Sequence, residues 1–166
     1  MTGAELLQDA AERYPGGKWA TDGHRAIETA ERRLNRVLRT HDMLATVTLT
    51  LVDGVADLPA DFLEIRTATA PWHRIAGSRI AGDASTLTFD YYAALPSLLV
   101  VPSNWLSVRN PELYVQAMLR AVFAKQGQMD AASVAEAEVR RLVAEENTAG
   151  AQRALSGRRM VLSQCP

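Results

Sequence analysis

The order of hydrophobic and polar residues divides the chain into a helical part, a strand-like part and a second helical part. Residues 3–13 place leucine and alanine on one side of a helix, and Pro15-Gly16-Gly17 ends it. A stronger repeat of three to four positions runs through residues 22–39, and its apolar members are Ile27, Ala30, Leu34, Val37 and Leu38. These patterns predict two amphipathic helices, over 3–13 and 22–39.

The spacing of apolar residues then changes to two. In residues 45–52, valine and leucine alternate with threonine, which is typical of a half-buried strand. Asp53-Gly54 follows, a pair that favours the two-residue type I′ turn, so we expect residues 55–58 to return as the second strand of a hairpin. Further strands are predicted over 62–70 and 85–95. A glycine-containing loop with one short strand near 79–81 connects them, and the β module covers about 45–93.

Helices return after Pro96 and Pro102. Asn110 and Pro111 are favoured at the start of a helix, and residues 111–125 are apolar on almost every side, as expected of a central helix. A last helix is predicted over 130–147, ending before Gly150. The predicted fold is mainly α, a bundle of about four helices with a small antiparallel β module inserted. Residues 1–150 form one domain and residues 151–166 a C-terminal arm.

Composition limits the possible functions. The chain has 166 residues, 48% of them hydrophobic, and a formal net charge of -1, so we expect a folded domain and not a polycation. The one cysteine, Cys165, allows no disulfide within the chain and no zinc site built on cysteines. The N-terminus lacks the basic and apolar regions of a signal peptide, and no apolar run reaches the ~18 residues of a membrane span. We therefore expect a soluble chain with no membrane partner.

No pattern predicts a catalytic, cofactor or metal site. His24, His41 and His73 do not share a helix face. Residues 77–82 have the glycine spacing of a phosphate-binding loop but lack the lysine that follows it in such loops. We expect no enzyme activity and no cofactor.

Two basic segments remain as candidate contact surfaces. The first is a charged helix face of arginines, which is either a solvated surface with local glutamate pairs or a face for an acidic partner or nucleic acid: Arg25, Arg32, Arg36 and Arg39. The second lies in the arm and is either a disordered terminus or a segment that docks in a groove of another chain: Arg153, Arg158, Arg159, Met160, Val161 and Leu162.

Several short motifs occur in a distinctive order. They are Leu58-Pro59-Ala60-Asp61-Phe62, then Tyr91-Tyr92 leading to Leu95-Pro96, then Asn104-Trp105-Leu106, then Pro111-Glu112-Leu113-Tyr114. In this order, over about residues 20–160, the chain resembles the head–tail adaptor (connector) proteins of tailed bacteriophages. The stretch between Ala70 and Ser85 departs from the resemblance, because similar proteins often have a longer insertion there.

The resemblance implies a structural protein of the virion neck, assembled in the cytoplasm of the host bacterium, with no catalytic residues. Such proteins form a ring, usually of about twelve copies, beneath the portal protein. The ring extends the channel for double-stranded DNA without reading its sequence, and it is the platform for the next neck or tail protein. The resemblance also implies that the C-terminal segment reaches toward the portal.

Within this framework we expect Trp105 and Tyr114 to be core residues, with Trp105 packing the β module against the bundle. Two other functions remain open. One is a small helical module that binds nucleic acid through the arginine face. The other is a stopper or tail-completion protein of the same neck.

Overall fold

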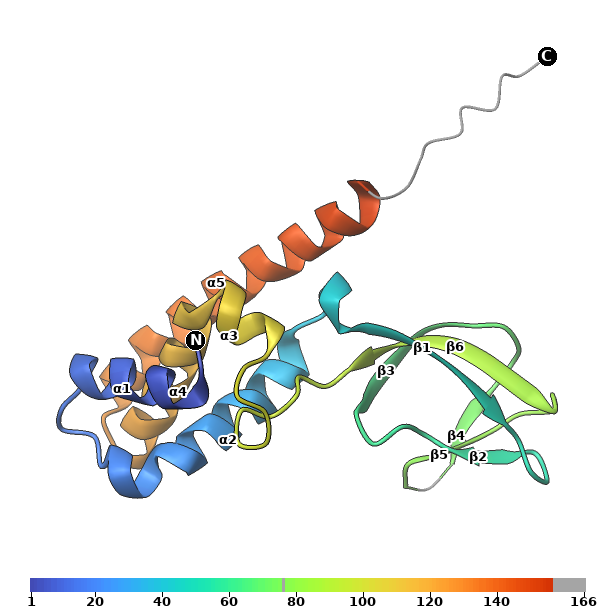
Figure 1. Ribbon diagram of the computed structural model, residues 1–166, viewed down its shortest axis with the longest axis horizontal. Helices are drawn as coiled ribbons and strands as arrows, with labels where there is room; N and C mark the ends of the chain where they lie inside the picture. The colour runs from blue at the N-terminus through green and yellow to red at the C-terminus, as the bar shows by residue number, and fades with distance from the viewer. Residues whose placement is uncertain (76, 157–166) are drawn as a thin grey trace, which may run out of the picture.

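The computed structural model of the protein describes residues 1–75 and 77–156, which form two lobes at opposite ends of a long molecule (Figure 1). The helical lobe contains both termini of the described chain. The β lobe is inserted between the second and third helices. The helices of the first lobe are α1 (Gly3–Arg13), α2 (Trp19–Val37), α3 (Trp105–Arg109), α4 (Pro111–Lys125) and α5 (Met129–Ser156).

Side-chain caps explain where two of these helices begin. At α1, the Thr2 hydroxyl accepts the backbone N–H of Glu5, and the Glu5 carboxylate accepts the N–H of Thr2 at 2.7 Å. At α4, Asn110 accepts the N–H of Leu113 and Pro111 occupies the first turn. Both helices have the bounds that the sequence predicts.

Helix α4 is the centre of the helical lobe. It packs against α5 and α2 along its length and also contacts α1 and α3. Its buried side chains point in almost every direction, as the apolar sequence predicts: Leu113, Tyr114, Val115, Ala117, Met118, Leu119 and Val122. The sequence predicted about four helices, and the described chain has five, because the short α3 precedes α4 at the Asn104 cap.

The prediction that the last helix ends before Gly150 is wrong. Helix α5 continues through Gly150 to Ser156, so residues 151–156 are helical. The reason is tertiary: Gly150 packs closely on Thr40, and a Cβ at position 150 would lie 3.1 Å from the Cα of Thr40 and crowd this contact. Helix α2 likewise covers residues 19–37, where 22–39 was predicted.

The β lobe has two three-stranded antiparallel sheets. One has the strand order β1 (Leu44–Thr50), β6 (Thr86–Ala93), β3 (Phe62–Ala68). The other has the order β2 (Val55–Asp57), β5 (Arg79–Ala81), β4 (His73–Ile75). The short strand near 79–81 is confirmed, whereas β4 was not predicted. The stretch between Ala70 and Ser85 therefore provides two of the three strands of this sheet as well as a connection.

The predicted hairpin forms only at its turn. Asp53 and Gly54 both have positive φ, 52° and 75°, as a type I′ turn requires. Beyond the single bridge between Val52 and Val55, however, β1 pairs with β6, and β2 pairs with β5 in the other sheet. The chain thus changes sheets at this turn. The buried side chains of the lobe are Leu51, Leu58, Ile80, Leu87, Phe89 and Tyr91.

Candidate assembly surfaces

An arginine fork fixes the joint between the two lobes. Arg109 at the end of α3 donates to Asp42 at 2.8 Å and to Glu146 of α5 at 2.9 Å, and its guanidinium lies 4.4 Å from the centre of the Trp105 ring. Asp42, in the 3-10 turn His41–Met43 before β1, also accepts from Arg153 at 3.1 Å. The start of the β lobe is therefore tied to both α3 and α5.

A second set of contacts joins the first sheet to the end of α2. The Arg39 side chain donates to Glu64 of β3 at 2.9 Å and lies over the ring of Tyr92. Its backbone N–H donates to Asn147 of α5 at 2.8 Å. Leu63 and Tyr92 of the β lobe pack on the core of the helical lobe. Polar and apolar contacts together favour a fixed angle between the lobes.

Buried polar groups pin the segment that returns from β6 to α3. The Glu31 carboxylate accepts the N–H of Leu98 at 2.7 Å, and Asn35 accepts the N–H of Leu95 at 2.9 Å. Asn104 donates to the hydroxyl of Tyr114 at 2.7 Å, and burial raises the pKa of this tyrosine far above its ordinary value. Sequence analysis missed Glu31. The available signal was its place four residues after Ile27, on the apolar side of α2.

The family motifs meet in the β lobe and at the start of α3. The Phe62 ring stacks on Tyr91 with 5.8 Å between ring centres, and the Tyr91 hydroxyl donates to Asp61 at 3.1 Å. Leu58 is buried in the same core, and Pro59 precedes β3. Tyr114 is fully buried in the helical core and Trp105 is half-buried against it. The two motifs of the β lobe are therefore one packing unit.

The predicted charged face does not form a uniform surface. Arg32 pairs with Glu28 at 2.7 Å, and Arg39 is part of the joint. Arg25 and Arg36 are exposed and make no ion pair with any described residue. A different set of arginines surrounds one carboxylate, Glu136: Arg33, Arg120 and Arg140.

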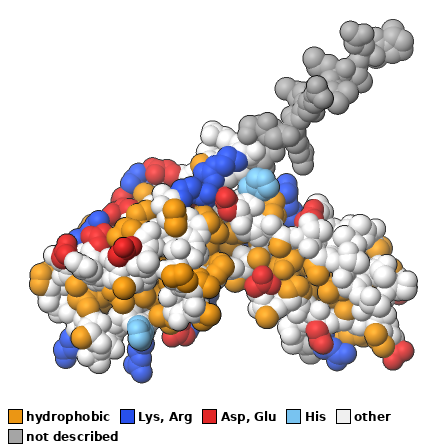
Figure 2. Space-filling view, viewed as in Figure 1, with side chains coloured by type: hydrophobic (Ala, Val, Ile, Leu, Met, Phe, Trp, Pro, Cys, Tyr) orange, Lys and Arg blue, Asp and Glu red, His pale blue; other side chains and the backbone are white. Residues whose placement is uncertain are grey.

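Hydrophobic side chains gather on the face of the helical lobe seen in Figure 2 and around the joint. Leu99 and Val100, in the segment before α3, are 45% and 85% exposed. Beside them, an open hollow of about 440 Å³ lies between α1, α2 and this segment, with Leu7, Ile27 and Leu98 among its lining residues. Exposed apolar surface of this kind marks contact sites in soluble proteins.

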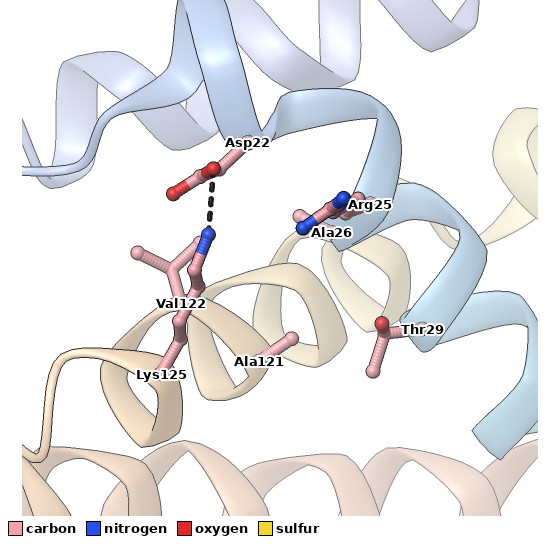
Figure 3. A pocket seen from close by; sticks show the side chains of 7 residues that line it. All are labelled: Asp22, Arg25, Ala26, Thr29, Ala121, Val122 and Lys125. Carbon is pink, nitrogen blue, oxygen red and sulfur yellow. Dashed lines mark ion pairs between the residues drawn. The ribbon is translucent and has the colours of Figure 1, made fainter.

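A smaller hollow of about 180 Å³ lies between α2 and α4 (Figure 3). Ala26, Ala121 and Val122 give it an apolar lining. Asp22 and Lys125 form an ion pair of 2.7 Å across one end, and Arg25 and Thr29 stand on the α2 side. Because Asp22 and Lys125 neutralise each other, the Arg25 guanidinium leaves the hollow with a positive charge.

The described residues contain no group of histidine, cysteine or carboxylate side chains arranged to hold a metal ion. Among the helices of the described chain, none combines the length and the apolar character needed to span a bilayer. Of the arm residues predicted to contact a partner, Arg153 lies at the joint. Arg158, Arg159, Met160, Val161 and Leu162 lie outside the described residues.

Comparison with known proteins agrees with the resemblance seen in the motifs. Residues 1–82 match the family model of the SU10 adaptor protein. The match covers α1, α2 and strands β1 to β5, and it ends before β6 and the three C-terminal helices. No curated protein matches the chain. The match of residues 1–82 supports the resemblance of this chain to the phage head–tail adaptors.

Proposed function

We propose that this protein is a head–tail adaptor that forms a ring beneath the portal in the neck of a tailed phage. The match of residues 1–82 to the adaptor family carries this proposal. The ring, of about twelve copies as the resemblance implies, would extend the DNA channel and be the platform for the next neck or tail protein. Its role is structural, and no residue of the chain is assigned a catalytic step.

The joint between the lobes supports a ring. A heterologous contact closes into a ring only when each copy presents its two contact surfaces at a constant angle. In this chain the angle is held by the Arg109 fork to Asp42 and Glu146, by Arg39 on Glu64, and by the buried pins of the returning segment. These contacts suit a structural subunit, which must keep a constant shape for the ring to close.

The C-terminal residues are proposed to contact the portal. Helix α5 carries the chain past the joint and away from the core of the helical lobe (Figure 1). The sequence that follows Ser156 combines Arg158 and Arg159 with Met160, Val161 and Leu162, a basic and apolar set suited to a groove with an acidic rim.

Native mass spectrometry of the chain mixed with its cognate portal ring tests the proposal. We expect loading in a fixed ratio that matches the symmetry of the portal. Deleting residues 157–166 should abolish loading and leave the fold intact, because Arg153 and its contact to Asp42 are retained. Arg140→Ala, at a largely exposed side chain on α5, is the control and should load normally. A chain that ignores the portal would contradict the proposal, and one that joins only after another neck protein would be a stopper.

Nucleic-acid binding through the arginine face is the competing function. Of the four arginines of that face, only Arg25 and Arg36 are exposed without an ion pair to a described residue. So few available charges give nucleic-acid binding little support. It predicts DNA affinity that falls steeply with salt, because bound cations are released from the phosphates. Replacing Arg25, Arg32 and Arg36 by serine should then abolish binding. If the wild-type chain has no measurable DNA affinity at low salt, this function is wrong.

A further inference from the structure

The two ends of the molecule carry features that complement each other. At the far end of the β lobe, the turn between β1 and β2 exposes Val52, which is 70% accessible, next to the carboxylate of Asp53. At the other end lies the hollow between α2 and α4, with its apolar lining and the guanidinium of Arg25. Figure 1 places the turn between β1 and β2 and the start of α2, whose residues line this hollow, toward opposite ends of the long axis.

We propose that the turn at Val52-Asp53 of one copy docks into the α2–α4 hollow of the next copy. Val52 would lie against Ala26 and Val122, and the Asp53 carboxylate would pair with Arg25. This inference rests on the proposed ring and names the contact that would build it. Since the two halves differ and both lie on every chain, the contact is heterologous and repeats from copy to copy.

Charge favours a second copy as the occupant. Asp53 makes no ion pair or side-chain hydrogen bond with any described residue, and neither does Arg25. Near the turn, Asp57 and Arg79 approach at 3.6 Å and offset each other, which leaves the turn with the charge of Asp53. The hollow has the opposite sign. Asp22 and Lys125 neutralise each other, so the remaining charge is that of the Arg25 guanidinium. The two surfaces therefore attract each other and repel their own kind.

The turn is also held in a fixed shape, which lowers the entropy lost on docking. Val52 and Val55 exchange two backbone hydrogen bonds of 2.9 and 3.0 Å. Gly82 of the neighbouring connection donates to the carbonyl of Gly54 at 3.0 Å. Asp53 and Gly54 both have positive φ, as this tight turn requires. The hollow is too small to hold two copies together by itself. We therefore expect this contact to set the register of a larger interface between the copies.

Cysteine crosslinking tests the contact. In a Cys165→Ser background, the pair Val52→Cys with Thr29→Cys puts one thiol on the turn and one beside the hollow. Mild oxidation of the adaptor–portal complex, and of concentrated adaptor alone, should give a ladder of dimers, trimers and larger multimers on a non-reducing gel. The matched control replaces Val52→Cys by Val134→Cys, an equally exposed valine on α5, and should give no ladder.

The outcomes separate this inference from the proposed function. Full loading of the portal without a ladder overturns the contact and leaves the adaptor function standing. Products that stop at dimers overturn it too, because they indicate a symmetric pair. A ladder in solution without portal loading supports the contact and contradicts the portal role. A chain that neither loads nor crosslinks overturns both.

A double-mutant cycle gives a second measurement. Asp53→Asn keeps a residue that tolerates positive φ and removes the charge, and Arg25→Gln removes its partner. Each change should weaken self-association about tenfold, and the two together should cost little more than one alone. Arg36→Gln, on an exposed arginine of the same helix, should have no effect. Additive losses, or no loss, would contradict the pairing.

Discussion

The helical lobe and the β lobe are stabilised in different ways. Among the described residues, the core of the helical lobe has 21 buried side chains, and that of the β lobe has six. The helical core also contains buried polar pins, Glu31 and Asn104, whereas the β lobe has hydrogen bonds between threonine and aspartate on its exposed face. The comparison indicates that the helical lobe is the more stable one. The β lobe, which carries the turn at Val52-Asp53, is expected to unfold more easily.

The largest effect is expected in the helical core. Leu113→Ala, at a fully buried position on the central helix, should lower the free energy of unfolding by about 3–5 kcal/mol, because α2 and α5 cannot close the space that it leaves. Thermal unfolding measures the loss. Val134→Ala, at a side chain that is 72% exposed, should change stability by about 0.5 kcal/mol or less. Equal effects of the two would contradict the role of α4 as the centre.

Ile80→Ala should cost the β lobe about 2–4 kcal/mol, because Ile80 is its fully buried residue on β5. In so small a core this loss is expected to open the β lobe by itself. Hydrogen exchange checks the difference between the lobes: protection should fall in residues 44–93 and persist in α4. If protection falls equally in both lobes, they unfold as one unit and the comparison is wrong.

Asn104→Ala should cost about 2–3 kcal/mol, because it removes the cap of α3 and leaves the buried Tyr114 hydroxyl without its donor. The matched change is Asn110→Ala, which removes the cap of α4 and a contact to Glu146 at the joint. It should cost about 1 kcal/mol. Denaturant unfolding separates the two. An equal cost would show that the buried hydrogen bond from Asn104 to Tyr114 adds no stability beyond that of a helix cap.

Asp90 gives the smallest expected effect, a dependence of stability on pH. Hydrogen bonds from Thr46 and Thr67 lower its pKa in the folded state below the ordinary value. Stability from this group is therefore present above the ordinary aspartate pKa of about 4 and is lost as the pH falls through the lower folded value. Asp90→Asn lacks this term. The difference in Tm between wild type and variant should shrink from pH 7 toward about pH 2.

The sequence predicted those elements of the fold that depend on hydrophobic periodicity or on the backbone preferences of neighbouring residues. The apolar circumference of 111–125 and the alternation of Leu87, Phe89 and Tyr91 specify a central helix and a half-buried strand through short-range geometry. Asp53-Gly54 likewise specifies a turn through its own backbone preferences. Of the proposed contact between copies, the sequence indicated only Arg25 as a candidate surface residue. It predicted the turn as a local structure but not as a contact site, and it gave no sign of the hollow.

Other features depend on residues that are distant in the sequence. Gly150 lies inside α5 in close contact with Thr40, and a glycine that ends a helix would look the same in the sequence. Arg39 fits the charged face by spacing, but the carboxylate of Glu64 draws it into the joint. The buried Glu31 is satisfied by the backbone of Leu98, 67 positions later.

The sequence by itself therefore determined the helices, the alternating strands, the turn at Asp53-Gly54 and the motifs that resemble an adaptor. The tertiary structure alone decided that β2 leaves β1 for β5, that the lobes meet through Arg109 and Arg39, and that an apolar hollow opens beside Arg25. The physical reason is range. Periodicity and backbone preference act over a few residues, whereas pairing of strands, burial of ion pairs and the shape of a surface require partners that only the folded chain brings together.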